Sequence, residues 1–363
     1  MTFPRARAAI DVGFEKGWHV GVQLAVWRNG EPVVDFAQGI ARENVAMATD
    51  SLMPWFSCTK LVTAVAIAQL VERNQLHLDR PVVDVVPEFA PHGKDTITLR
   101  HVLTHTGGFR KPAGADELFT GGVDPTALFQ QICDAPLEWA PGTRAGYHPV
   151  TGFHLLGEMI RRVDGRAPED FIAEEIFEPL GMADAWLALS PERVAAYGDR
   201  IGVMHDTTVQ PPKPYAPRYY TWPLPSSSGI GPFNELVRVA EALRQGGALD
   251  GERILSPDAV ALLTARHRVG MKDETFGAVI DWGLGVMVNS IQYTGKPAPY
   301  GYGDHASTDA FGHGGQQSSI VFADPGAGLS VALCCNGMAG EPVNHRRTQP
   351  VLTALYEDLA PTI

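Results

Sequence analysis

A serine and a lysine three residues apart are the first side chains of this sequence that could act together chemically. They are Ser57 and Lys60 in the stretch PWFSCTK, which leads directly into a long apolar segment. If a helix begins at or just after Ser57, the two side chains share one face. A serine hydroxyl becomes a strong nucleophile when a base takes its proton, and burial can lower the pKa of a lysine amine enough to make it that base. A serine cap followed by a solvent-exposed lysine is the simpler alternative.

A tyrosine far along the chain is the second candidate. Tyr147 follows a Pro-Gly turn and precedes a helical pattern in PGTRAGYHPVTGFHLLGEMI. Such a tyrosine commonly packs against the core while its hydroxyl bonds to a nearby acceptor. A phenol held near a lysine ammonium is instead stabilised as the phenolate, and it can relay a proton from a serine to a leaving group.

A glycine-rich turn that runs into an apolar strand, FGHGGQQSSIVFADP, is the third element. Gly314 and Gly315 allow the backbone to approach a ligand closely, and the strand edge beyond them can present an N–H group. Together with the N–H of Ser57, that group could stabilise an oxyanion. Taken alone, the glycines also fit an ordinary hairpin.

The elements that must position these residues are strands at both chain ends and helices between them. With 363 residues and 45% hydrophobic composition, the chain is long enough for two domains or one large two-lobed unit. Patterning predicts a hairpin turn at Asn29-Gly30. It also predicts strands over 20–28, 31–41, 282–289, 316–325 and 329–337, and helices over 59–76, 99–108, 150–165 and 233–247.

This order predicts an α/β (α+β) fold, in which one antiparallel sheet is built from both chain ends and a mainly helical lobe is inserted. We expect residues 1–65 and 270–363 to form a discontinuous sheet domain, and residues 66–269 to form the helical domain with its active-site loops. The aromatic and proline-rich segment 210–225 is predicted to form a wall of the binding cleft. Loops 109–125 and 205–228 are expected to set substrate specificity.

The composition narrows the classes of partner. Lys and Arg total 29 against 41 Asp and Glu, so the formal net charge is −12, which argues against a nucleic acid or an anionic membrane. No apolar signal-peptide core and no run of about 18 apolar residues is present, so we expect a cytoplasmic protein. Nothing in the sequence indicates the oligomeric state. The four cysteines are a poor disulfide framework and fit a reduced compartment: Cys58, Cys133, Cys334 and Cys335.

The order and spacing of these elements resemble the serine β-lactamase and penicillin-binding-protein superfamily. Within it, the chain is most similar to the class C β-lactamase-like branch, which includes the family VIII carboxylesterases. The resemblance implies a β-lactamase/transpeptidase-like fold, an antiparallel sheet flanked by helices beside a helical lobe. It spans about Val20 to Asn336 and is carried by Ser57-Cys-Thr-Lys60, by Pro141-Gly142 with Tyr147 five residues on, and by His313-Gly314-Gly315.

The resemblance also implies roles for these residues. Ser57 would attack a substrate carbonyl, while Lys60 and Tyr147 share the proton transfers. The backbone N–H groups of Ser57 and Gln316 would hold the oxyanion. We further expect substrate contacts from His313, Gly314, Gly315 and His148, a small-molecule ester as substrate, and neither a metal nor an organic cofactor.

Two departures from the superfamily pattern bear on the substrate. Where β-lactamases carry Tyr-x-Asn, this chain has Tyr147-His148-Pro149, so a side-chain amide that contacts the substrate and the lysine is missing. Where they carry Lys-Thr-Gly, this chain has His313-Gly314-Gly315, and a mostly neutral histidine is a poorer partner for the β-lactam carboxylate. Both departures favour an ester-cleaving relative.

Several other functions remain open at this point. An α/β-hydrolase is disfavoured because no G-x-S-x-G occurs. A metal hydrolase is disfavoured because His101 and His105, at helical spacing, lack an accompanying H-E-x-x-H or cysteine-pair signature; they are expected to cap or brace the LTHTGG turn. An amidase or D-amino-acid peptidase, a weak β-lactamase, an acyltransferase and a non-catalytic penicillin-binding-like module are the alternatives to an esterase.

Overall fold

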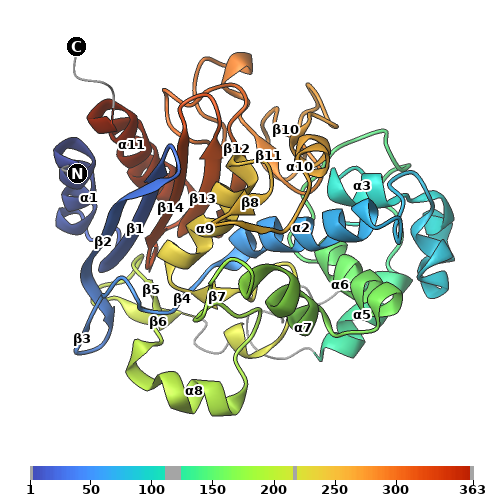
Figure 1. Ribbon diagram of the computed structural model, residues 1–363, viewed down its shortest axis with the longest axis horizontal. Coiled ribbons are helices and arrows are strands. Elements are labelled where there is room, and N and C mark those ends of the chain that lie inside the picture. Colours follow the sequence, from blue (N-terminus) through green and yellow to red (C-terminus); the bar gives the residue numbers. More distant parts are fainter. Residues whose placement is uncertain (1–2, 111–123, 216–218, 360–363) are drawn as a thin grey trace.

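A central antiparallel sheet organises the computed structural model, which describes residues 3–110, 124–215 and 219–359 (Figure 1). The sheet has eight strands in the order β10-β11-β12-β13-β14-β1-β2-β3. In chain order the strands are β1 (Gly21–Arg28), β2 (Glu31–Arg42), β3 (Val45–Ala46), β10 (Asp281–Trp282), β11 (Met287–Val288), β12 (Phe311–Gly315), β13 (Ser319–Asp324) and β14 (Leu329–Cys335).

The two chain ends meet in the middle of this sheet. Strand β1 pairs with β14 over its length, with Val26 opposite Val331. Between β1 and β2, Asn29 and Gly30 adopt positive φ angles of 51° and 95°, as a two-residue hairpin turn requires. The predicted hairpin and the predicted sheet of N- and C-terminal strands are therefore confirmed.

Helices cover both faces of the sheet. Helices α1 and α11 pack against each other on one face, and α9 packs on β1, β13 and β14 from the other (Figure 1). The helices are α1 (Pro4–Glu15), α2 (Thr59–Glu72), α3 (Leu99–Leu103), α5 (Pro125–Asp134), α6 (Thr151–Asp164), α7 (Pro168–Ile172), α8 (Pro191–Tyr197), α9 (Phe233–Arg244), α10 (Pro257–Thr264) and α11 (Glu341–Leu359).

Helix α2 carries the serine–lysine pair into the interior. Most of its residues are buried on all sides, as the scarcity of polar positions predicts, and it packs on α6 and α10. It ends at Glu72 rather than at residue 76, because Asn74 adopts a left-handed φ of 58°. Helix α3 is likewise shorter than the predicted segment 99–108, since His105 has a φ of 57°.

Two predicted segments differ in detail from the structure. The single strand predicted over 282–289 is a short hairpin, because Gly285 reverses the chain between β10 and β11 with a φ of 82°. Part of the proline-rich segment is regular, since β6 (Lys213–Tyr215) pairs with β5 (Met204–Asp206). The remaining short strands are β4 (Met53–Pro54), β7 (Ile230–Gly231), β8 (Ala248–Leu249), β9 (Glu252–Arg253) and β15 (Gly337–Met338).

The division into domains remains a prediction. Helix α9 lies within the segment predicted as helical lobe, yet it covers the sheet. Much of the predicted specificity loop 109–125, and residues 216–218 of the other loop, lie outside the described residues. Within 3–110, 124–215 and 219–359, no helix combines the length and hydrophobicity that crossing a lipid bilayer requires.

We predict that the centre of the sheet controls stability. Val331 is 1% exposed and packs in the cluster that α1 and α11 cover, so Val331→Ala leaves a cavity there. We expect the free energy of unfolding to fall by about 2–3 kcal/mol. The control Val269→Ala makes the same change at a side chain that is 59% exposed, and we expect at most about 0.5 kcal/mol. Urea denaturation measures both; equal losses would contradict the assignment of the core.

Candidate active site

The turn that carries Ser57 is held in a strained backbone conformation. Phe56 has a φ of 47°, a region that residues other than glycine rarely adopt. Its neighbours anchor it, because the Trp55 N–H donates to the Gly229 carbonyl at 2.8 Å and the Thr59 hydroxyl donates to the Phe56 carbonyl at 2.6 Å. Ser57 is thereby placed at the start of α2 in one orientation.

Lys60 is fully buried one turn after Ser57. Its Nζ atom lies 3.0 Å from Ser57 Oγ, and it donates to the carbonyls of Pro149 at 2.7 Å and Ser226 at 2.8 Å. No carboxylate of the residues that the structure describes forms an ion pair with it. Burial therefore holds the pKa of this amine well below its usual value of 10.5.

The Tyr147 hydroxyl completes a three-residue cluster by donating to Ser57 Oγ at 2.8 Å. Lys60 Nζ lies 5.2 Å from the centre of the Tyr147 ring and 5.2 Å from that of Phe153. The predicted convergence of Ser57, Lys60 and Tyr147 is thus present in the geometry. Tyr147 is ninety residues away from Ser57 in the chain, so the fold brings it to the serine–lysine pair.

A buried aspartate fixes the segment that carries Tyr147. Asp273 Oδ1 accepts the backbone N–H groups of Tyr147 at 3.1 Å, Thr275 at 2.9 Å and Phe276 at 3.1 Å. Its other oxygen lies 3.1 Å from the guanidinium of Arg268, and both side chains are almost completely buried. The Thr275 hydroxyl donates to the Tyr147 carbonyl at 3.0 Å. Asp273 therefore joins the tyrosine segment to the neighbouring cavity wall.

Ser57 and Tyr147 open onto a cavity of about 480 Å³. Of the other predicted site residues, His313, Gly314 and Gln316 also line it. Gln316 follows β12 directly, so its backbone lies at the strand end that faces Ser57. Lining residues that sequence reasoning missed are Phe56, Pro149, Ser227, Thr275, Phe276, Met287, Pro299, Tyr300 and Glu341.

The histidine that replaces the superfamily lysine is neutral. Burial lowers the pKa of His313 to about 3, and its Nδ1–H donates to the Gly314 carbonyl at 2.8 Å. The glycines beside it permit close packing. A Cβ on Gly314 would lie 2.1 Å from the Tyr300 ring, and one on Gly315 would lie 2.4 Å from the Trp55 carbonyl. The lack of a side chain at Gly315 therefore lets β12 pack closely against the turn that carries Ser57, and Gly315 does not line the cavity.

His148 does not reach the cavity, contrary to our expectation of a substrate contact. It is fully buried beside Phe109 and His105, at ring-centroid distances of 4.6 Å and 5.1 Å, and burial lowers its pKa to about 3. Neighbouring residues of an extended segment point in opposite directions. Tyr147 and Pro149 line the cavity, so the ring between them faces the interior.

Pro149 also corrects an expectation. A proline at this position removes a side-chain amide, and we expected its contact with the lysine to be lost. The Pro149 backbone carbonyl supplies that contact instead, at 2.7 Å from Lys60 Nζ. Pattern matching on side chains cannot detect such a replacement, because every residue carries a carbonyl.

The predicted aromatic wall is packed differently. Tyr215 and Trp222 pack against the main core and Tyr220 against a small cluster around Ile230, and none of these three lines the cavity. From this part of the chain Ser227 reaches the cavity.

The histidines weighed as metal ligands have structural roles. His101 forms a reciprocal capping box with Thr98 at the start of α3, and the backbone N–H of His148 donates to the ring of buried His105 at 3.1 Å. Across the described ranges, no group of three or more His, Cys, Asp or Glu side chains is arranged to hold a metal ion. All four cysteines are free and buried.

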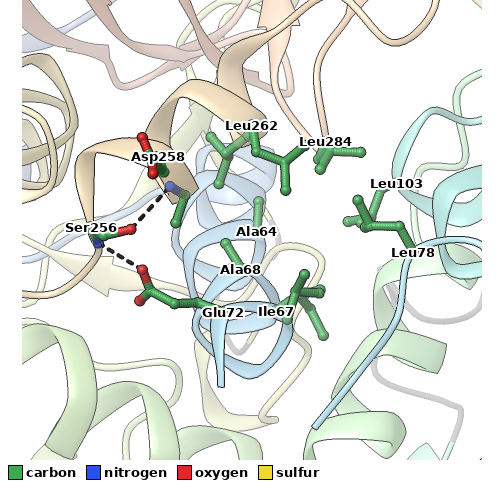
Figure 2. Close-up of a pocket in the computed structure, with 13 residues that line it drawn as sticks. Ala64, Ile67, Ala68, Glu72, Leu78, Leu103, Ser256, Asp258, Leu262 and Leu284 are labelled. Atoms are coloured by element: carbon green, nitrogen blue, oxygen red, sulfur yellow. Dashed lines mark hydrogen bonds between the residues drawn. The ribbon is translucent and has the colours of Figure 1, made fainter. Parts of the chain in front are cut away.

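A second pocket, of about 230 Å³, lies between α2 and α10 (Figure 2). Mainly aliphatic side chains point into it, among them Ile67, Leu262 and Leu284. Its polar groups satisfy each other, because the Glu72 carboxylate accepts the N–H of Ser256 at 3.0 Å and the Ser256 hydroxyl caps α10. Its one described lining serine, Ser256, has its hydroxyl engaged as a helix cap, and none of the described lysines, histidines or tyrosines lines the pocket. The cavity at Ser57 is therefore the candidate active site.

Comparisons with known proteins identify the family of this chain. The Beta-lactamase family model matches residues 6–355. A penicillin-binding protein homologue from Caulobacter crescentus has a crystal structure with a TM-score of 0.83 and 31% identity, over 98% of this chain and 97% of its own. The chain therefore belongs to the beta-lactamase family, and the predicted fold is confirmed.

Esterases are among the most similar proteins of this family. Esterase EstB from Burkholderia gladioli is 29% identical over 93% of this chain and 92% of its own length. A crystal structure of a family VIII carboxylesterase has a TM-score of 0.80 and 28% identity, over 98% of this chain and 97% of its own. The resemblance to the esterase branch of the family thus extends over nearly the whole chain.

We predict that Asp273 is needed for both stability and the tyrosine position. Asp273→Ala leaves three backbone N–H groups without their acceptor and Arg268 without its counter-charge, so we expect a loss of about 3–5 kcal/mol in the free energy of unfolding. Asp95, an exposed aspartate, provides the control Asp95→Ala, with at most about 0.5 kcal/mol. Urea denaturation is the measurement. Similar stabilities for the two variants would show that Asp273 does not anchor this segment.

Proposed function

We propose that this protein is a serine hydrolase that cleaves small or medium carboxylic esters through an acyl-enzyme on Ser57. One observation carries the proposal: Ser57 Oγ lies 3.0 Å from the Lys60 amine and 2.8 Å from the Tyr147 hydroxyl, beside a cavity large enough for a small substrate. The similarity to EstB and to a family VIII carboxylesterase supports an ester as the substrate.

Lys60 is the proposed base for acylation. A neutral amine has two N–H bonds and one lone pair. The carbonyls of Pro149 and Ser226 accept the two N–H groups, which leaves the lone pair for the proton of the Ser57 hydroxyl. Burial favours this neutral form because it disfavours the charged one.

Tyr147 is the proposed carrier of the proton on the cavity side. Ser57 Oγ attacks the ester carbonyl, its proton passes through Lys60 and Tyr147 to the leaving oxygen, and the alcohol departs. In the second half-reaction water attacks the acyl-serine and the same groups take its proton. The carboxylic acid is then released and the Ser57 hydroxyl is regenerated. The backbone N–H groups of Ser57 and Gln316 are proposed to hold the oxyanion in both steps.

The cavity fits an ester better than a β-lactam or a peptide with a free carboxylate. Such substrates need a cation at the site, and the superfamily lysine is replaced by His313, whose pKa of about 3 leaves it uncharged at neutral pH. Every group that this mechanism needs belongs to the chain itself. The amidase, peptidase, β-lactamase and acyltransferase alternatives share the acylation step and differ in the leaving group or in the acceptor.

We predict that acylation depends on Ser57 and Tyr147. A fluorophosphonate probe should modify Ser57 in the wild type, and Ser57→Ala should abolish both labelling and ester turnover. Tyr147→Phe should lower kcat by roughly 10²–10⁴-fold, since it removes one proton carrier. The measurement is a panel of p-nitrophenyl esters, D-amino-acid amides, D-peptides and a β-lactam, compared with the Ser57→Ala variant as blank.

Each result of this panel is decisive. Ser57-dependent turnover that is fastest on esters supports the proposal. Faster Ser57-dependent turnover of amides, D-peptides or the β-lactam would assign the alternative activity. No labelling and no turnover would identify a non-catalytic binding module.

We also predict an acid limb in the pH profile that belongs to Lys60. The reactive form is the neutral amine, so kcat/KM should fall as pH drops through the Lys60 pKa, which burial places well below 10.5. Lys60→Arg keeps a cation that stays protonated at every usable pH, so it should be inactive throughout. Rates from about pH 5 to 10 measure this. Wild-type-like activity of Lys60→Arg would rule out the lysine as base.

A further inference from the structure

The mouth of the cavity has a composition that the ester chemistry itself does not require. From the nucleophile outward, the Tyr147 ring contacts Phe276 at a centroid distance of 4.9 Å, and Phe276 lies 6.1 Å from the Tyr300 ring. The Tyr300 hydroxyl then contacts both carboxylate oxygens of Glu341 at 2.7 Å. Phe276, Tyr300 and Glu341 all line the cavity.

Glu341 gives this mouth a negative charge that no lining cation offsets. The described lining residues include no lysine or arginine, and His313 is neutral. Burial raises the pKa of Glu341, whereas the Tyr300 hydroxyl and the charge of Arg347, on the same helix, lower it. Arg347 is itself buried and donates to the backbone carbonyls of Gln317 and Gly337. Arg346 lines an adjacent groove, which Tyr300 and Glu341 also line, and it does not line the cavity. A charged group of a substrate at this end therefore meets a carboxylate first.

The carboxylate is held in place rather than free to swing away. The Gln317 N–H donates to the Tyr300 hydroxyl at 2.9 Å, so the phenol proton is directed to Glu341. The absence of a side chain at Gly314 lets the Tyr300 ring lie against the β12 backbone. Glu341 itself stands on the first turn of α11 and is exposed, so it retains acceptor capacity for a ligand.

We propose that Phe276, Tyr300 and Glu341 form a subsite for an ammonium group of the substrate. Aromatic side chains and a carboxylate at one end of a mainly apolar cavity are the groups that bind an alkylammonium, by cation–π attraction and by charge. The inference rests on the proposed esterase function and specifies its substrate class. Esters that carry an ammonium group are preferred, and those that carry a carboxylate are rejected.

The test uses three matched esters: one with a trimethylammonium group, its tert-butyl carbon isostere, and a carboxylate counterpart. One set places the group on the acyl side and a second set on the alcohol side, because either part of the ester can occupy the subsite. The readout is the ratio of kcat/KM for the ammonium ester to that for the isostere. We expect a ratio above one in at least one set, and a decrease when salt screens the charge.

The decisive variant is Glu341→Gln, which keeps an acceptor for the Tyr300 hydroxyl and removes the charge. We expect the ratio to fall about tenfold in that set and the carboxylate ester to improve. The matched control is Glu357→Gln in the last turn of the same helix, roughly 24 Å away, which should leave the ratio unchanged. Thermal unfolding of both variants checks that they fold.

The outcomes separate this inference from the proposed function. Esters can be hydrolysed in a Ser57-dependent way while the ratio of kcat/KM values is one or below, or is unchanged in Glu341→Gln. That result contradicts the subsite and leaves the proposed esterase function supported. If no ester is hydrolysed, the subsite is tested by binding alone. Calorimetry then compares the affinities of the ammonium ester and its isostere for the Ser57→Ala variant and for the Ser57→Ala, Glu341→Gln double variant. Tighter binding of the ammonium ester than of the isostere, lost when Glu341→Gln is added, supports the subsite. Equal binding of the two esters, or a preference that Glu341→Gln leaves unchanged, overturns it.

Discussion

The removal of the Lys60 amine from water is the constraint on which the active site depends. An ammonium ion in this position would lose its hydration and gain two carbonyls, without a carboxylate to balance its charge. The neutral amine fits the same position at no such cost. The burial of most of α2, which its apolar sequence dictates, therefore favours the neutral amine that the proposed role of Lys60 as base requires. The two carbonyls also orient it, since they leave one direction for its lone pair.

The lining of the cavity likewise contains few charged groups. His313, where the resemblance implies a lysine in related enzymes, is kept neutral by burial, so the only ionic group in the lining that the structure describes is Glu341. An anionic substrate would meet a net repulsive field there, whereas a neutral or cationic one would not. A neutral histidine at this motif position thus leaves the charge of Glu341 unbalanced within the lining, while Ser57, Lys60 and Tyr147 keep the contacts of the proposed acylation cluster.

The sequence predicts what depends on local pattern and on motif order. Strand pairing at Asn29-Gly30, the buried helix α2 and the convergence of Ser57, Lys60 and Tyr147 follow from such signals. Contacts made by a backbone carbonyl, such as that of Pro149, leave no trace in residue types. Asp273 and Glu341 come from a loop and a helix end whose approach to the site is set by tertiary packing. His148 failed as a prediction because motif adjacency does not tell which side of an extended segment a residue faces.

The residues of the proposed acylation cluster and those of the proposed ammonium subsite lie on different elements, so substrate specificity can change without a change in the acylation chemistry. Ser57 directly precedes α2 and Lys60 stands on this mostly buried helix, while the buried Asp273 holds the backbone of Tyr147. We therefore expect substitutions of the groups that position this cluster to cost stability. Phe276 and Tyr300 stand on two different loops, and Glu341 stands on the first turn of α11, where it is exposed to solvent. Phe276 and Tyr300 also pack against a core cluster, whereas Glu341 is exposed, so its substitution should disturb little of the core. On the proposed function, a change at Glu341 alone should therefore alter the preference for substrate charge while the contacts among Ser57, Lys60 and Tyr147 are kept.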